Sequence, residues 1–389
     1  MASEPVHQVS VVIPTWKRDD LLRKCLESLR RQTLPDFEVV IVSNGAGAWA
    51  EDLAREFGCT LVRFAENRGF AVAVNTGIAA SESPYVAVLN DDAELDPGWL
   101  EKTVAVLEKL SSISFCCGKI YIVAQDDRSE GGRTIDDAGD ALSMAGAAWR
   151  LGHGRSDAAE FNQARPLVAV SLTAALFRRA VFEKIGNLDE KFISYLEDMD
   201  YSIRLWRGGL RGLYVPQAVA RHQGGASLGG ASFDGQNSRE RFRLMTRNQL
   251  ALLAKHYPGA LWLRLAARIT WAQILWFGMA VRKGLLGAYL AGVWQYISLL
   301  PQCIRKRTPW SKGERRAFLD WLRESERANY EDISARPRKE QDTYWRMYFA
   351  LFRPRRASSV AGISSEPGGV DEEQEADPSS SRRAGTRSG

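Results

Sequence analysis

Residues 9–89 alternate between short apolar runs and longer segments with helical spacing, and this alternation restricts the possible folds more than any other feature of the chain. The runs predict strands at 9–13, 37–42, 60–64 and 85–89, and the segments between them predict helices at 19–32, 48–58 and 70–81. In the first helix, Leu22, Leu26 and Leu29 fall on one face. Strands that alternate with helices in this way form a mainly parallel central sheet with flanking helices, so we predict the α/β class.

From about residue 113 to 225 the pattern is mixed. We expect strands at 115–123, 167–177 and 210–222, and helices from about Pro97, at 179–186 and at 197–209. The Gly-rich segment 222–238 has the composition of a mobile loop. A further helix is expected over 239–257, and it leads into an apolar region.

Composition excludes several classes of protein. Apolar and charged fractions of 45% and 25% are ordinary for a soluble globular protein, and a net charge of +5 is too small to favour nucleic-acid binding. The five cysteines are odd in number and scattered, which argues against a disulfide framework or a zinc site and favours a reducing compartment. The N-terminus lacks the pattern of a secretory signal, so we expect the protein to stay in the cytoplasm.

Three polar residues end the last of these strands. Asn90, Asp91 and Asp92 directly follow the apolar run 85–89. They could cap the helix that starts near Pro97. They could also hold a divalent cation whose shell a bound phosphate completes, because ligands of such sheets bind beyond the carboxyl ends of the strands.

A second acidic group starts the helix expected at 197–209. Glu197, Asp198 and Asp200 could cap this helix, with Asp200 and Arg204 pairing on its solvent face. His222 follows at the end of a strand, and a single histidine is more often structural than a ligand. Three such features in this order are much less likely to occur by chance, so we favour a functional site.

Six segments in this order resemble inverting glycosyltransferases of family 2, which have the GT-A nucleotide-diphospho-sugar-binding fold. The segments are VVIPTWKRDDLLRKCLESLRRQT, FEVVIVSNGA, ENRGFAVAVNTGI, VAVLNDDAELDPGWL, GNLDEKFISYLEDMDYSIRLWRGG and VPQAVARHQGGAS. The resemblance covers about residues 8–255 and is closest to the bacterial branch that includes rhamnosyltransferases of cell-surface polysaccharide synthesis. It implies a nucleotide-binding half at 8–110 and an acceptor half at 111–255 within a domain at 1–255.

The resemblance also implies roles for individual residues. Donor-binding roles fall on Thr15, Arg18, Asn44, Asn67, Arg68, Gly69, Asn90 and Asp91. Metal-binding roles fall on Asp92 and His222, the general base is Asp198, and Glu197 and Asp200 are acceptor-side or secondary residues. Asn90 and Ser43 stand where the family usually carries acids, which leaves the identity of the nucleotide open.

The implied reaction moves a sugar from a nucleotide-diphospho-sugar to a hydroxyl group of a glycan or lipid-linked acceptor. Mg²⁺ or Mn²⁺ would stabilise the departing diphosphate, and one carboxylate would take the proton of the acceptor hydroxyl. We expect Asp198, at a helix N-terminus, to stay ionised and to act through its position rather than through a strongly raised pKa. No organic cofactor is needed.

Two other functions are compatible with such a fold. A membrane-tethered sugar-nucleotide-binding module could have kept the fold and lost the chemistry, although the presence of Asp92, Asp198 and His222 together argues against it. A nucleotidyltransferase would carry a Gly-rich phosphate loop after the first strand, where this chain has PTWKRDD.

Residues 256–355 are expected to form a helical, membrane-associated region. The segments 269–281 and 284–304 carry no charge, basic residues follow at 305–307, and the segment 342–356 is aromatic and basic. Neither charge-free segment is convincing as a membrane span, so we favour peripheral or monotopic attachment at the cytoplasmic face of the membrane. The alternative is a helical hairpin that packs on the catalytic domain. Residues 356–389 have the composition of a disordered tail.

Overall fold

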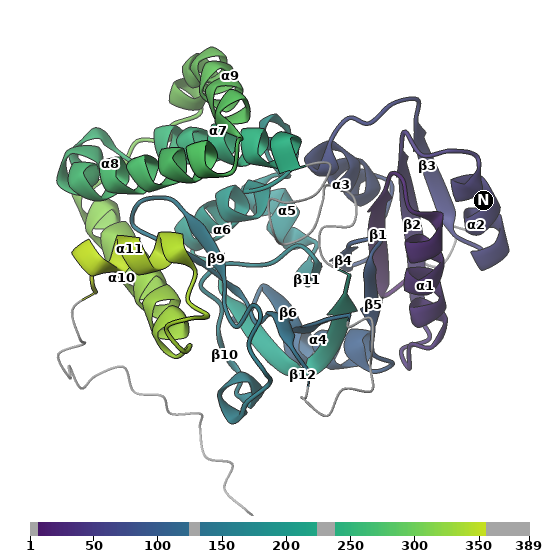
Figure 1. Cartoon of the computed structure of the whole chain (residues 1–389). Coiled ribbons are helices and arrows are strands. Elements are labelled where there is room, and N and C mark those ends of the chain that lie inside the picture. Colours follow the sequence, from purple (N-terminus) through teal and green to yellow (C-terminus); the bar gives the residue numbers. More distant parts are fainter. Residues whose placement is uncertain (1–6, 124–132, 224–237, 355–389) are drawn as a thin grey trace, which may run out of the picture. The chain divides into compact units, whose positions relative to one another are not determined.

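A sheet of ten strands forms the centre of the computed structural model, which describes residues 7–123, 133–223 and 238–354 (Figure 1). The strands are β1 (Val9–Thr15), β2 (Phe37–Asn44), β3 (Thr60–Phe64), β4 (Tyr85–Leu89), β5 (Ala93–Leu95), β6 (Phe115–Ile122), β7 (Ile135–Asp137), β8 (Asp140–Leu142), β9 (Ala148–Arg150), β10 (Arg165–Pro166), β11 (Ala174–Arg178) and β12 (Gly212–His222). The pair β8–β9 forms a separate small sheet.

Helices cover both faces of the large sheet. They are α1 (Asp19–Arg30), α2 (Trp49–Phe57), α3 (Phe70–Ala79), α4 (Trp99–Lys109), α5 (Ala180–Ile185), α6 (Glu197–Arg207), α7 (Ser238–His256), α8 (Gly259–Arg282), α9 (Leu286–Arg305), α10 (Lys312–Ser334) and α11 (Thr343–Leu351). Side chains of α1 and α4 pack on one face, and those of α3, α5 and α6 pack on the other.

Strand direction divides the large sheet into two parts. The strands β3, β2, β1 and β4 lie side by side in this order and are parallel. Next to them β11 runs antiparallel to both β4 and β6, and β12 is parallel to β6. The α/β class is confirmed, and the parallel pairing holds for the first four strands, whose carboxyl ends therefore meet at one edge.

The strand β1 shows why this part of the chain folds as it does. All of its residues are buried, as expected for a continuous apolar strand with helices on both faces. Val11 and Ile13 face α1, and Val12 faces α3. Gly77 lets α3 approach the sheet closely, because a Cβ atom there would lie 2.2 Å from Cγ1 of Val12.

The predicted elements between residues 9 and 122 are confirmed with small shifts of their ends, and two differences concern the site. The strand expected at 167–177 begins only at Ala174, because the preceding residues form a loop in which the carbonyl of Thr173 accepts a hydrogen bond from the N–H of Asn90 at 2.9 Å. The helix expected from Pro97 begins at Trp99 and is preceded by β5, which the sequence did not reveal. Of the Gly-rich segment, residues 224–237 lie outside the described residues.

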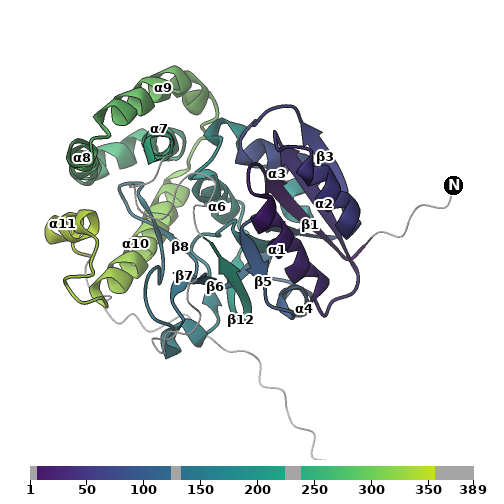
Figure 2. The ribbon, with the colours of Figure 1, turned by 45° about the vertical axis from the view of Figure 1, so that its right-hand side comes forward.

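The helices α7 to α11 lie beside the end of the sheet that is farthest from β3 (Figures 1 and 2). They share a hydrophobic core with α6. In this core the rings of Phe242 and Trp276 stack with their centroids 4.3 Å apart, and the ring centroids of Trp206 and Phe318 are 5.6 Å apart. The predicted C-terminal helical region is confirmed, whereas its boundary near residue 255 stays a prediction. Among the described helices, none combines the length and apolarity that crossing a bilayer requires. The predicted tail at 356–389 lies outside the described residues.

Candidate active site

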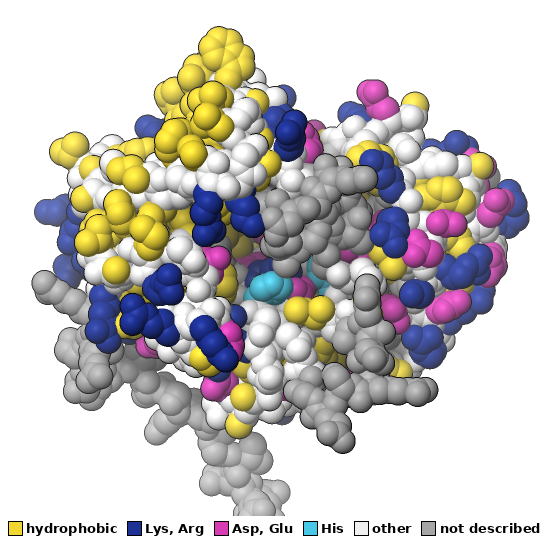
Figure 3. All heavy atoms as spheres, viewed as in Figure 1, with side chains coloured by type: hydrophobic (Ala, Val, Ile, Leu, Met, Phe, Trp, Pro, Cys, Tyr) yellow, Lys and Arg dark blue, Asp and Glu magenta, His cyan; other side chains and the backbone are white. Residues whose placement is uncertain are grey.

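A cavity of about 500 Å³ opens at the carboxyl edge of the parallel strands. Its polar end is lined by Thr15, Asn44, Asn67, Asn90, Asp91, Asp92, Arg150, Glu197, Asp198 and His222. Its apolar end is lined by Trp149, Met245, Trp276, Met279, Tyr344 and Trp345. Histidine and acidic side chains are visible at the bottom of this hollow, between the helices α7–α11 and the parallel strands (Figure 3). The structure therefore gathers at one place most of the residues that the sequence singled out.

The end of β4 lies directly beside the end of β1. Thr15 donates a hydrogen bond from Oγ1 to Oδ2 of Asp91 at 2.7 Å. Burial, together with the neighbouring charge of Asp92, raises the pKa of Asp91 to about 7. Oδ1 of Asn90 is buried and accepts no hydrogen bond from any of the described residues. Such a buried, unsatisfied acceptor at the cavity wall is suited to a donor group of a ligand.

Asp92 and His222 form the pair that could hold a cation. The strands β5 and β12 pair so that Ala93 stands opposite His222, which brings Nε2 of His222 to 3.1 Å from Oδ1 of Asp92. On the other side of the ring, Nδ1 lies 2.7 Å from Oδ2 of Asp136. Burial alone would lower the pKa of His222, but the two carboxylates raise it to about 10.

This arrangement fits a divalent cation with few protein ligands. The carboxylate of Asp136 on Nδ1 would orient the ring, and a bound cation would displace the proton of Nε2, which would then be the ligand. Two ligands at roughly 2.1 Å from one ion and at right angles are about 3 Å apart, as Asp92 and His222 are. Among the described residues no group of three His, Cys, Asp or Glu side chains is arranged to hold a metal ion. The remaining ligands would have to come from a substrate and water, as Mg²⁺ usually requires.

A strained segment precedes the second acidic group. Ile193, Tyr195 and Leu196 have positive φ angles of 65°, 69° and 64°, which residues other than Gly rarely adopt. Nδ2 of Asn248 lies within hydrogen-bond distance of three carbonyl oxygens of this segment, those of Phe192, Ser194 and Tyr195, at 2.8, 2.8 and 2.7 Å. The side chain of Asn248 is fully buried in α7. The helix α7 thus holds the backbone turn that leads into α6.

The two adjacent acids Glu197 and Asp198 both lie at the cavity and are shifted toward the neutral form. Oδ1 of Asp198 accepts a hydrogen bond from the N–H of Met199 at 2.7 Å. Burial raises the pKa of Asp198 to about 6 and that of Glu197 to about 8. The expectation that Asp198 has no strongly raised pKa is therefore wrong, because desolvation exceeds the effect of the helix N-terminus. The pKa of Asp198 is raised less than that of Glu197, which favours Asp198 as the ionised residue of the two and therefore as the base.

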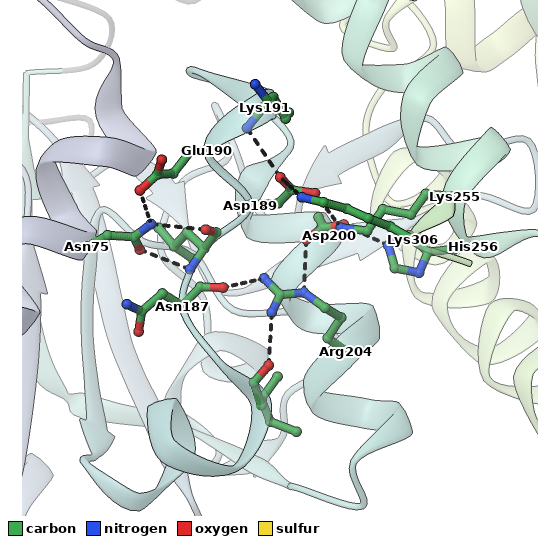
Figure 4. A network of polar contacts seen from close by, with 12 residues as sticks. Asn75, Asn187, Asp189, Glu190, Lys191, Asp200, Arg204, Lys255, His256 and Lys306 are labelled. Atoms are coloured by element: carbon green, nitrogen blue, oxygen red, sulfur yellow. Dashed lines mark hydrogen bonds and ion pairs between the residues drawn. The ribbon is translucent and has the colours of Figure 1, made fainter. Parts of the chain in front are cut away.

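Asp200 lies outside the cavity. It is fully buried and accepts hydrogen bonds from Lys255 at 2.6 Å, His256 at 2.7 Å and Arg204 at 3.0 Å (Figure 4). The predicted pair with Arg204 exists, but the predicted solvent face is wrong, because α7 covers it. Burial opposes ionisation of Asp200, and the charges of Lys255 and Arg204 nevertheless hold its pKa well below its ordinary value.

The same network connects three helices. Lys255 also contacts Asp189 at 2.7 Å, and Lys306, at the end of α9, contacts Asp189 at 2.7 Å (Figure 4). Asp200 of α6 and Lys255 of α7 are therefore joined to the end of α9 through buried or half-buried ion pairs. The arrangement gives Asp200 a role in packing rather than in contact with a ligand.

The donor loops are partly assembled at the cavity. Nδ2 of Asn44 donates to Oδ1 of Asn67 at 3.0 Å, and the N–H of Arg68 donates to Oδ1 of Asn44 at 2.8 Å. Asn44 and Asn67 line the cavity. Arg68 and Gly69 do not line it, but their backbone N–H groups donate hydrogen bonds to the side chains of Asn44 and Asn67. Arg18 lies outside the cavity wall and pairs with Asp20 at 3.0 Å.

Comparison with known proteins shows the fold and a similarity to one family. Residues 10–186 match the sequence model of the family Glycosyl transferase family 2. This match makes residues 10–186 similar to that family. A chain of GalNAc-T7, solved with UDP, GalNAc and Mn²⁺, superposes with a TM-score of 0.54 at 14% identity, over 79% of this chain and 59% of that one. At this identity the superposition shows the fold alone, which is that of a GT-A glycosyltransferase.

Two curated relatives are similar to more than half of this chain. The O-antigen biosynthesis protein RfbC of Myxococcus xanthus is 29% identical over 239 residues, which are 57% of this chain and 18% of RfbC. The uncharacterized glycosyltransferase EpsJ of Bacillus subtilis is 26% identical over 217 residues, which are 53% of this chain and 60% of EpsJ. The aligned region thus covers less than two thirds of the length of each of these relatives.

Several residues of the candidate site could not be singled out from the sequence, above all Asp136. This residue accepts hydrogen bonds from His222, from His153 at 3.0 Å and from Arg150 at 2.8 Å. Burial opposes its ionisation, but these partners hold the pKa of Asp136 well below its ordinary value. The cluster of acids in TIDDAGD at 134–140 was the available signal, although nothing in it points to His222.

Proposed function

We propose that the chain is a metal-dependent inverting glycosyltransferase that uses a nucleotide-diphospho-sugar. One observation carries the proposal: Asp198 lines the same cavity as the Asp92–His222 pair. Its carboxylate accepts the N–H of Met199, and among the described side chains no charged group is in direct contact with it. A general base and a site for the leaving diphosphate are the two parts that such a transfer needs. A hexosyl group is the expected sugar class.

The polar end of the cavity would bind the donor. Asn44, Asn67 and Thr15 supply hydrogen-bonding groups for the nucleoside, and Asn90 and Asp91 lie where ribose and sugar hydroxyls would follow. Asp92 and His222 would hold Mg²⁺ or Mn²⁺, which supplies positive charge for the departing diphosphate. Arg150 adds a guanidinium group at the same end of the cavity.

The transfer itself would be a single displacement. Oδ2 of Asp198 takes the proton of an acceptor hydroxyl, while Oδ1 stays bound to the N–H of Met199. The acceptor oxygen forms a bond to the anomeric carbon, the bond from that carbon to the diphosphate oxygen breaks, and its electron pair leaves with the diphosphate. Attack from the side opposite the leaving group inverts the configuration of the anomeric carbon.

The acceptor would enter from the apolar end. Trp149, Trp276 and Trp345 offer aromatic surfaces of the kind that sugar rings or lipid chains contact. Because one relative is named an O-antigen biosynthesis protein, we infer an acceptor of surface polysaccharide assembly, either a glycan or a lipid-linked sugar. The enzyme would then work in the cytoplasm at the inner face of the membrane.

A panel of nucleotide sugars tests this proposal. The full chain should bind one donor in the presence of Mn²⁺ and should release the nucleoside diphosphate when an acceptor is added. Chelation or Asp92→Ala should abolish release. Full release in excess chelator would refute the metal requirement, and donor binding without any release under all conditions would favour the inactive binding module.

A further inference from the structure

The outer face of α9 carries a continuous apolar stripe. Its exposed fractions are 38% at Leu286, 56% at Leu290, 70% at Trp294, 52% at Ile297 and 50% at Ile304. With 3.6 residues per turn, these positions lie roughly 120–200° around the helix from Gly292. Gly292 is buried against α7, where a Cβ atom would lie 2.6 Å from the carbonyl oxygen of Arg243. Close packing through Gly292 therefore fixes which face of α9 is exposed.

The stripe continues on α8. Ile274, Phe277 and Val281 are exposed by 53%, 43% and 53%. The ring of Phe277 meets Tyr289 of α9 edge to face, with centroids 5.4 Å apart. The two helices thus form one apolar surface, which we call the outer face of the α8–α9 hairpin, and Figure 3 shows hydrophobic side chains gathered over α9.

The same two helices also carry exposed basic residues. Arg264, Arg282 and Arg305 are exposed on the two helices. The sequence from residue 241 to 313 contains no Asp or Glu, so no acidic side chain of this stretch offsets the basic ones. A helix with exposed apolar residues on one side and basic residues beside them is typical of proteins that lie on anionic membranes.

We propose that the outer face of the α8–α9 hairpin docks on an anionic lipid bilayer, with both helices parallel to the membrane surface. Leu290, Trp294 and Ile297 would enter the boundary between headgroups and acyl chains, and the arginines would contact the headgroups. A second copy of this chain fits less well, because two acid-free basic faces would repel each other.

Docking in this way would place the cavity near the bilayer, a consequence that rests on the proposed function. Trp276 and Met279 lie on the inner side of α8 and line the apolar end of the cavity. The outer side of the same helix would contact lipid, so the cavity is separated from the membrane by about one helix diameter, roughly 10 Å. A lipid-linked acceptor could span this distance without leaving the bilayer.

Vesicle sedimentation of the full chain tests the docking. The chain should sediment with vesicles that contain phosphatidylglycerol and much less with vesicles of phosphatidylcholine alone. Leu290→Glu and Trp294→Glu should each lower the partition onto anionic vesicles about tenfold or more. Leu110→Glu is the matched control, because Leu110 is 38% exposed at the end of α4 and should leave the partition unchanged.

Three results would overturn the docking: no sedimentation of the full chain with anionic vesicles, an equal loss in the control, or full retention of Leu290→Glu. If the wild-type chain is a dimer that does not bind vesicles, and Leu290→Glu dissociates this dimer, the face would instead be the contact with a second copy of the chain. Release of nucleoside diphosphate on a water-soluble acceptor, measured in the same samples, separates the two proposals. Release without vesicle binding refutes the docking alone, and vesicle binding without release refutes the proposed function alone.

Discussion

Replacing Asn248 with Ala should separate the positioning of Asp198 from the binding of the donor. Asn248 contacts three carbonyl groups of the segment that leads into α6. The –NH₂ group has two hydrogens for these three acceptors, so at about 1 kcal/mol of net stabilisation for each hydrogen bond it contributes about 2 kcal/mol. The three residues with positive φ angles cost roughly 1–2 kcal/mol each, so the bonds to Asn248 offset a substantial part of this strain. Without the amide, the segment should relax toward negative φ angles and move Asp198.

The expected result is a loss of rate with retained donor binding. A displacement of about 1 Å at a reacting group can cost about 10²-fold in rate, so kcat of Asn248→Ala should fall by about that factor. The donor residues lie on other elements, so the dissociation constant of the donor should change little. Steady-state rates and donor titration on the folded variant measure the two quantities separately.

Asn329→Ala is the matched control for this variant. Asn329 is equally buried, on α10, and its side-chain amide makes no hydrogen bond with the described residues. It should leave kcat within about twofold of the wild type. If Asn248→Ala lowers the free energy of unfolding but keeps the wild-type kcat, Asn248 has only a structural role and the reasoning fails.

Three other substitutions have defined outcomes. Glu197→Gln should keep kcat within about threefold, because burial raises the pKa of Glu197 to about 8 and the residue is already neutral; a loss above tenfold in steady-state assays would give its carboxylate a part in the reaction. Asp136→Asn should weaken Mn²⁺ binding by roughly 10–100-fold, because His222 loses the carboxylate that orients it, and unchanged affinity by calorimetry would contradict this. Asp200→Asn should lower the free energy of unfolding by about 3–5 kcal/mol without changing donor affinity, since it leaves buried cations unpaired; a loss below about 1 kcal/mol in urea titrations would contradict the packing role.

The parallel half of the fold was predictable because its signals are local. Apolar runs such as Val9–Ile13 and the leucines of α1 have the periods of a buried strand and an amphipathic helix, and the acids after Leu89 follow directly from the strand. The helix α10 lies within the predicted helical region, but its own start was not predicted, although Ser311 and Glu314 form a capping box, a recognisable start signal.

The parts that could not be predicted depend on contacts between distant segments. Asp136 and His222 are 86 positions apart, and only the pairing of β6 with β7 and β12 brings them together. Likewise, the sequence around Asn248 has no feature that indicates three carbonyl groups near residue 194. The raised pKa of Asp198 was missed because its desolvation comes from neighbouring elements, which the helix position alone does not reveal.

The most direct test of the proposed transfer is the pH dependence of nucleoside diphosphate release by the wild type and by Asp198→Asn, at saturating Mn²⁺. The base must be ionised to accept a proton, and burial raises the pKa of Asp198 to about 6. The wild-type kcat/KM should therefore fall as the pH drops below about 6 and level off above it. Asp198→Asn should be slower by about 10²-fold or more, should lose this pH step and should bind the donor normally. A variant that keeps the wild-type rate and the same pH step would contradict the assignment of Asp198 as the base.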